Sequence, residues 1–337
     1  MPDVVQEALE DADNYEQSLN ATLALLHLYK FDDSSKSIDS SIKAWFGKKM
    51  KPSDVTPDLL IQLNSERGVI GELKRSFPKN NKEGKDLWEE EFKQLKEYDK
   101  DLEGWETESK KIKGQDLILL TSQKLGVSVS DYIDGKNLSF NSFSKNFSVW
   151  QFNPTAGIKQ AVFLQKIKGE ITDFKNVTNQ RMRSGVPIAL EYILSSGLSK
   201  VKFIDYKPNV VYLMSILWDF VFSTLPTEED WRNTRESKGG KLVEIPIKIE
   251  EIATILNKNF TLDGQNGIIK NDWIKEALEN LVKLKLAKKS KLGSDYIIKF
   301  RKKIKDEEEG ANKQKVFAEL LYKEGIQTSL SDLTNSD

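Results

Sequence analysis

Residues 57–74 (PDLLIQLNSERGVIGELK) constrain the fold of this chain most strongly, because two apolar runs flank a polar turn. Residues 59–63 and 69–77 have the length and composition of β-strands, and residues 64–68 are a cluster of turn-forming residues. The pattern predicts a β-hairpin. Asp58 opens the first run, and Glu72 and Lys74 lie near the end of the second, so charged residues stand at the ends of strands that are otherwise apolar.

The expected pairing of these strands predicts which charged side chains share a face. With a turn centred near Glu66, Asp58 lies opposite Lys74, and Glu72 is a diagonal neighbour with a Cα–Cα distance of roughly 7–8 Å. Asp58, Glu72 and Lys74 then converge at one edge of a sheet. Two carboxylates at that separation repel each other. A divalent cation between them would remove the repulsion, lower the pKa of a bound water and stabilise charge on a phosphoryl oxygen.

The composition restricts the class of protein and the chemistry. The chain has 337 residues, of which 38% are hydrophobic and 31% charged, which is typical of a globular protein with two domains. No apolar run approaches the roughly 18–20 residues of a membrane-spanning helix, and the acidic N-terminus does not resemble a signal peptide. We therefore expect a cytoplasmic protein without a membrane partner.

The absence of cysteine excludes disulfides, thiolate zinc sites, iron–sulfur clusters and cysteine nucleophiles. The single histidine, His27, lies in an apolar helical segment and is expected in the core. A metal site would then consist of carboxylates around a hard cation, Mg²⁺ or Mn²⁺.

The order of predicted elements indicates an α/β or α+β domain with a central mixed sheet over residues 1–205. Beyond the hairpin, helices are expected at residues 3–30, 36–47, 86–111 and 187–196, strands at 116–121, 147–152, 160–171 and 201–204, and irregular structure at 124–145.

The hairpin and the helix after it carry a family resemblance. Pro57-Asp58, thirteen further residues and Glu72-Leu73-Lys74 resemble the PD-(D/E)xK motif of restriction-endonuclease-like nucleases. Residues 94–98 (QLKEY) resemble the Q-h-x-x-Y motif of the RecB-like branch, and Gln94 and Tyr98 share a helical face at this spacing.

The resemblance implies a restriction-endonuclease-like sheet flanked by helices and a role for each matching residue. Asp58 and Glu72 would hold the metal, and Lys74 would assist the attacking water or the transition-state charge. Gln94 and Tyr98 would orient the site or the substrate backbone. A third acidic ligand is expected on the first helix, where Glu16 is one candidate and Glu7 and Glu10 compete with it.

Residues 206–305 resemble a winged helix-turn-helix domain, with helices at 249–256 and 271–284 and strands at 243–247, 286–290 and 296–300. Residues 306–337 are expected to form a polar tail with one helix at 313–323.

Two basic segments are candidates for contact with nucleic-acid phosphates. The loop after the hairpin contributes Arg75, Lys79 and Lys82, which suit either phosphate contact or a solvated loop. The wing contributes Lys285, Lys288, Lys289, Lys291 and Arg301, within a stretch from 283 to 305 that holds ten Lys or Arg residues and one acidic residue. Packing or a protein partner is the alternative use of the wing.

The sequence thus favours a Mg²⁺-dependent nuclease that hydrolyses DNA, with a winged-helix domain that positions the substrate. One alternative is a non-catalytic DNA-binding protein, regulatory or replication-related, on a degenerate nuclease fold. Another is a scaffold within a larger complex. RNA as the substrate, the type of cleavage, and a homo-oligomer or protein complex all stay open.

Overall fold

The computed structural model describes residues 3–31, 36–74, 87–106, 111–135, 143–155, 161–232, 236–237, 240–265, 267–290, 295–301, 304 and 312–325. The chain divides into two compact units, one of residues 17–205 and one of residues 1–16 with 206–337. Helix α1 (Asp3–Lys30) contributes residues to both units. We expected residues 1–16 in the first domain, whereas the structure groups them with the second.

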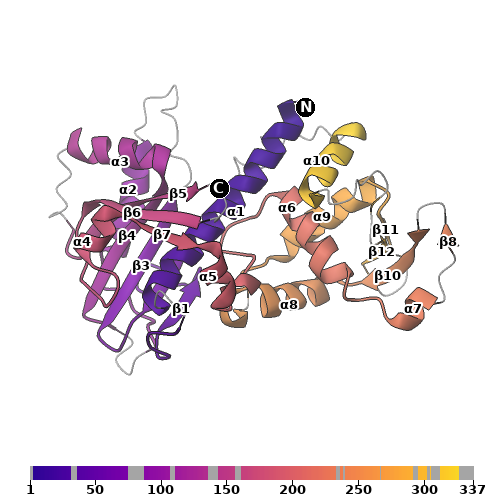
Figure 1. Ribbon diagram of the computed structural model, residues 1–337. Helices are drawn as coiled ribbons and strands as arrows, with labels where there is room; N and C mark the ends of the chain where they lie inside the picture. Colours follow the sequence, from indigo (N-terminus) through magenta and orange to yellow (C-terminus); the bar gives the residue numbers. More distant parts are fainter. Residues whose placement is uncertain are drawn as a thin grey trace. The chain divides into compact units, whose positions relative to one another are not determined.

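The unit of residues 17–205 is built on a mixed sheet of seven strands in the order β1-β2-β3-β4-β5-β6-β7 (Figure 1). The pairs β3–β4 and β4–β5 are parallel and the other neighbouring pairs are antiparallel. The strands are β1 (Lys43–Phe46), β2 (Leu59–Gln62), β3 (Arg67–Lys74), β4 (Gly114–Ser122), β5 (Asn146–Thr155), β6 (Ala161–Gly169) and β7 (Val186–Ala189). The expected central mixed sheet is confirmed.

One face of this sheet is covered by α2 (Leu87–Tyr98) and α3 (Gln123–Gly135). Their apolar residues form one buried cluster with the strands, which includes Leu60, Ile70, Leu117 and Leu119 from β2, β3 and β4. Residues two apart in a strand point to the same face. Glu72 and Lys74, which follow Ile70 at this spacing, therefore lie on the face covered by α2.

Several predicted elements of this unit are wrong. The helix expected at residues 86–111 ends at Tyr98, residues 201–204 form no strand, and the helix expected at 187–196 begins only at Leu190, after strand β7. Residues 36–47, expected as a helix, contain strand β1, because pairing with β2 outweighs the local helical pattern. Residues 124–145, expected as irregular, contain most of α3. Leu125, Val129 and Ile133 recur at intervals of four and pack on the same cluster, which is the helical signal that the serine-rich composition obscured.

The other unit combines a three-stranded sheet with helices. Its strands lie in the order β10-β12-β11, and β12 pairs with both neighbours in antiparallel orientation. Trp218 packs against Phe300 of β12 and Phe317 of α10, so α10 belongs to this core and not to a separate tail. The main elements are α6 (Val210–Ile216), η3 (Leu217–Phe222), β10 (Val243–Ile247), α8 (Ile249–Phe260), α9 (Asn271–Lys283), β11 (Ala287–Lys289), β12 (Tyr296–Phe300) and α10 (Lys313–Lys323).

Short elements complete the two units. They are α4 (Asn179–Ser184), α5 (Leu190–Ser195), η2 (Leu198–Lys200), α7 (Glu228–Arg232), β8 (Glu236–Ser237), β9 (Gly240–Lys241) and η4 (Leu262–Gly264). His27 is buried in α1, as expected. Of the helices that the structure describes, none combines the length and apolar character of a membrane span.

Candidate functional site

The β2–β3 hairpin places Asp58 beside Glu72. Leu59 pairs with Gly71, so the next residue outward on each strand sets Asp58 across from Glu72. We expected Asp58 opposite Lys74, and that register is wrong by two residues. Because side chains alternate with a period of two, the shift still leaves these side chains on one face.

The turn explains the observed register. The side-chain oxygen of Asn64 accepts hydrogen bonds from the backbone N–H groups of Glu66 and Arg67, at 2.9 and 2.8 Å. The N–H of Leu63 then donates to the carbonyl of Arg67 at 3.0 Å, which centres the turn on Ser65. An asparagine that bonds its own backbone in this way is a common turn device.

A closed ring of polar contacts joins the end of β3 to α2. The ammonium group of Lys74 lies 3.1 Å from Glu72 Oε1 and donates to Gln94 Oε1 at 2.9 Å. Gln94 Nε2 donates to the hydroxyl of Tyr98 at 2.8 Å, and this hydroxyl donates to Glu72 Oε2 at 3.0 Å. The side chain of Glu72 is 4% exposed and that of Lys74 is 16% exposed, so the ring is largely removed from solvent.

Asp58 lies against this ring and is electrostatically unfavourable as an anion. Its Oδ2 accepts a hydrogen bond of 2.6 Å from the backbone N–H of Leu73. Burial and then the negative charge of Glu72 hold the pKa of Asp58 well above its ordinary value, although the Leu73 bond and Lys74 act in the opposite direction. Burial and the same carboxylates raise the pKa of Tyr98, which keeps its hydroxyl protonated as a donor.

The donors present suit a hard divalent cation. Two carboxylates on adjacent strands, with one ammonium group beside them, leave an excess of negative charge that a cation would neutralise. Mg²⁺ prefers oxygen ligands and is commonly held by one or two carboxylates while it keeps several waters. Within the described ranges, no three His, Cys, Asp or Glu side chains are grouped as a ready-made metal site. The two carboxylates that could hold such a cation, with water as its other ligands, are those of Asp58 and Glu72.

Glu16, the expected third acidic ligand, belongs to a different compact unit from Asp58 and Glu72. Glu16 is exposed on the part of α1 that belongs to the other unit. There the pKa of Tyr212 is raised, first by burial and then by the charge of Glu16.

The basic residues expected to contact phosphates have different surroundings in the structure. Lys288 forms an ion pair with Glu244 at 2.8 Å and Lys289 one with Glu279 at 2.9 Å, so both ammonium groups already have carboxylate partners. Lys285 follows α9 as an exposed residue with a φ of 59°. Arg301 is half-buried, and its carbonyl accepts from Trp218 Nε1 at 3.1 Å. The remaining candidates lie outside the described residues: Arg75, Lys79, Lys82 and Lys291.

Asp205 is a further acidic residue near the site that the sequence did not single out. Its negative charge is among those that act on Asp58. No sequence motif contains this position, because 147 residues separate it from Asp58 along the chain. Only the folded structure makes the relationship visible.

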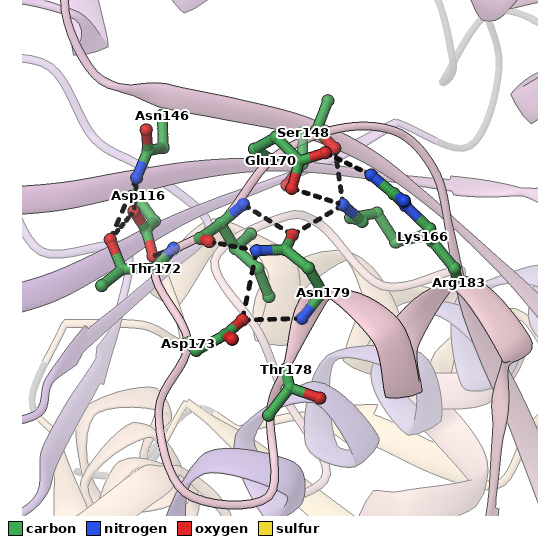
Figure 2. A network of polar contacts seen from close by, with 12 residues as sticks. Asp116, Asn146, Ser148, Lys166, Glu170, Thr172, Asp173, Thr178, Asn179 and Arg183 are labelled. Atoms are coloured by element: carbon green, nitrogen blue, oxygen red, sulfur yellow. Dashed lines mark hydrogen bonds and ion pairs between the residues drawn. The ribbon is translucent and has the colours of Figure 1, made fainter.

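A second polar network lies toward the start of β4 and has a structural explanation (Figure 2). Asp116 accepts three hydrogen bonds from Asn146 and Thr172. Buried Lys166 donates to the carbonyl of Gly169, to Asn179 and to Glu170. These contacts pair the buried Asp116 and Lys166 and fix the segment between β6 and α4 to the sheet.

Comparisons of the chain with models of protein families, with curated proteins and with solved structures gave no match in any of the three.

Proposed function

We propose that this protein is a metal-dependent nuclease that hydrolyses phosphodiester bonds in DNA. The observation that carries the proposal is the ring of Lys74, Gln94, Tyr98 and Glu72, with Asp58 on the adjacent strand. These are the five residues that the resemblance to the PD-(D/E)xK nucleases selected from two separate motifs. A hairpin with solvated charged ends would have no reason to bury Glu72 and to bond it to a helix 26 positions away.

The arrangement supports a division of roles among these side chains. When bound, Mg²⁺ would activate a water molecule and stabilise charge on the phosphate. Asp58 and Glu72 would hold it. Tyr98 and the backbone N–H of Leu73 each donate to one carboxylate oxygen, which orients the two carboxylates. Lys74 lies close enough to Glu72 to donate to the attacking water or to a phosphate oxygen.

We further propose that residues 17–205 adopt a restriction-endonuclease-like fold and that residues 206–305 contain a winged-helix domain that binds the substrate. The order of strands β10-β12-β11 and the helices α8 and α9 support the second assignment. Non-sequence-specific phosphate contact is favoured over base recognition. Helix α9 exposes Asp272, whose charge would repel a DNA groove, whereas Glu276 is paired with Lys207 at 2.7 Å.

Cleavage assays with the full chain test the proposal. Linear and circular double-stranded DNA, single-stranded DNA and RNA are incubated with Mg²⁺, with Mn²⁺ and with a chelator. We expect metal-dependent cleavage of DNA by the wild type and none by Lys74→Ala. Cleavage that persists in the chelator would contradict the proposal. DNA binding without cleavage under every condition would favour the alternative of a non-catalytic binding protein.

A further inference from the structure

Asp205 lies directly against Gly47. A Cβ atom built on Gly47 would be 2.0 Å from Cγ of Asp205 and 2.3 and 2.4 Å from its two carboxylate oxygens. Gly47 also has a φ of +55°, a conformation that side chains rarely adopt. Both the backbone conformation and the approach of the carboxylate therefore require glycine at position 47.

The sheet places this contact beside the candidate site. Phe46 pairs with Leu59 in the β1–β2 ladder, so Gly47 and Asp58 are the next residues outward on the two strands. Gly47 directly follows Phe46 and Asp58 directly precedes Leu59, so the carboxylate of Asp205 lies against a residue at the same end of the sheet as Asp58. The charge of Asp205 acts on Asp58, in agreement with this placement.

Asp205, Asp58 and Glu72 thus lie at the same end of strands β1, β2 and β3, and the ammonium group of Lys74 lies beside Glu72. Like charges at short separation disfavour one another in a partly buried site. A divalent cation with its hydration shell would reduce the repulsion between these carboxylates. Because Mg²⁺ keeps several of its waters, a carboxylate can contribute through a metal-bound water without touching the ion.

We infer that Asp205 is the third acidic group of this site and helps to hold the divalent cation through a water of its hydration shell. The inference rests on the proposed function and deepens it. It assigns a positioning role to the residue at which the chain leaves the unit of residues 17–205.

Direct measurement of Mn²⁺ binding to the full chain tests this role without reference to cleavage. Free Mn²⁺ is followed by its electron paramagnetic resonance signal for the wild type, Asp205→Asn, Asp58→Asn and the exposed control Asp101→Asn. Loss of a partner beyond the direct ligands commonly weakens metal binding by about 10-fold to 100-fold. We expect a loss in that range for Asp205→Asn, a greater loss for Asp58→Asn, and none for Asp101→Asn.

A second pair of variants separates the effect on Asp205 from a general effect of backbone strain on the fold. Gly47→Ala would displace the Asp205 carboxylate, whereas Gly197→Ala introduces a side chain at a φ of +79° with no atom within 4 Å. The two substitutions share the backbone strain, and only the first disturbs Asp205. We expect weaker Mn²⁺ binding in Gly47→Ala than in Gly197→Ala.

The outcomes separate the two proposals. If Asp205→Asn binds Mn²⁺ as the wild type does while Asp58→Asn does not, the role of Asp205 is overturned and the proposed function stands. If the wild type binds no Mn²⁺ and cleaves no DNA, the proposed function fails and the role of Asp205 fails with it.

Discussion

The hydroxyl of Tyr98 donates a hydrogen bond of 3.0 Å to Glu72 Oε2, from helix α2 to strand β3. The same hydroxyl accepts from Gln94 at 2.8 Å, so its proton is directed at the carboxylate. The helix therefore fixes the orientation of Glu72, and this contact links the two sequence motifs of the candidate site.

Tyr98→Phe removes this donor and keeps the ring. We expect a loss of about 1 kcal/mol in the free energy of unfolding, the usual value for one hydrogen bond. We also expect the cleavage rate to fall about 10-fold, because a misoriented Glu72 carboxylate would hold the reacting groups less well in position. Urea unfolding and single-turnover cleavage measure the two effects. Tyr322→Phe, at an exposed tyrosine of the other unit, is the control. A cleavage rate equal to that of the wild type would show that Tyr98 does not position Glu72.

Asp58→Asn should stabilise the metal-free protein at neutral pH. The pKa of Asp58 is raised well above its ordinary value in the folded state, by burial and then by Glu72. Between the two pKa values the folded state binds more protons than the unfolded state, so the free energy of unfolding falls as the pH rises through this window. Each pKa unit corresponds to about 1.4 kcal/mol. Asparagine carries no charge, so the free energy of unfolding of Asp58→Asn should not fall in this way as the pH rises.

Urea unfolding of Asp58→Asn and of the wild type at several pH values, with a chelator present, tests whether the variant is the more stable protein. The advantage of the variant should grow from about pH 4 upward and shrink when Mn²⁺ is added, because the cation compensates the charge in the wild type. An advantage that is equal at all pH values would contradict the raised pKa.

Much of the site could be predicted from the sequence, because its information is local. The face shared by Asp58, Glu72 and Lys74 follows from the period of two in a strand, which a register shift of two residues does not alter. The pairing of Gln94 with Tyr98 follows from the helical repeat. The register itself depended on the side chain of Asn64, which determines where the chain turns.

The features that could not be predicted from the sequence depend on contacts between residues far apart in the chain. Strand β1 exists because β2 provides its partner, and the carboxylate of Asp205 can lie against position 47 because that residue is glycine. The partners of the wing lysines also could not be predicted from the local sequence. Lys288 and Lys289 are part of a basic stretch in the sequence, but the fold brings a glutamate to each of them.

Asn64→Ala tests the cause of the register. Removal of the side chain leaves two backbone N–H groups of the turn without their acceptor, and we expect a loss of about 1 kcal/mol in the free energy of unfolding. Ser65→Ala, at the centre of the same turn, should change it much less. Equal stability of the two variants in urea unfolding would mean that another feature sets the turn.

Glu244→Gln tests whether the wing contacts DNA. The substitution removes the carboxylate that pairs with Lys288 at 2.8 Å and so releases a positive charge for phosphates. We expect the variant to bind DNA more tightly at low salt. The slope of the logarithm of the DNA-association constant against the logarithm of the salt concentration should steepen by up to about one unit, which is the contribution of one phosphate contact. Fluorescence anisotropy with a labelled duplex measures both. Glu250→Gln, at an exposed position of α8, should leave both unchanged, and an unchanged slope in Glu244→Gln would exclude Lys288 from the interface.

Single-turnover cleavage of duplex DNA by Glu72→Gln tests the central claim most directly. Glutamine keeps the size of the side chain and the oxygen that accepts from Tyr98, but it loses the charge that would hold the cation. The matched control is Glu89→Gln, an exposed glutamate of α2. We predict that Glu72→Gln retains its fold and its DNA binding and loses Mg²⁺-dependent cleavage by at least about 100-fold, while Glu89→Gln cleaves as the wild type does. Undiminished cleavage by Glu72→Gln would contradict the account.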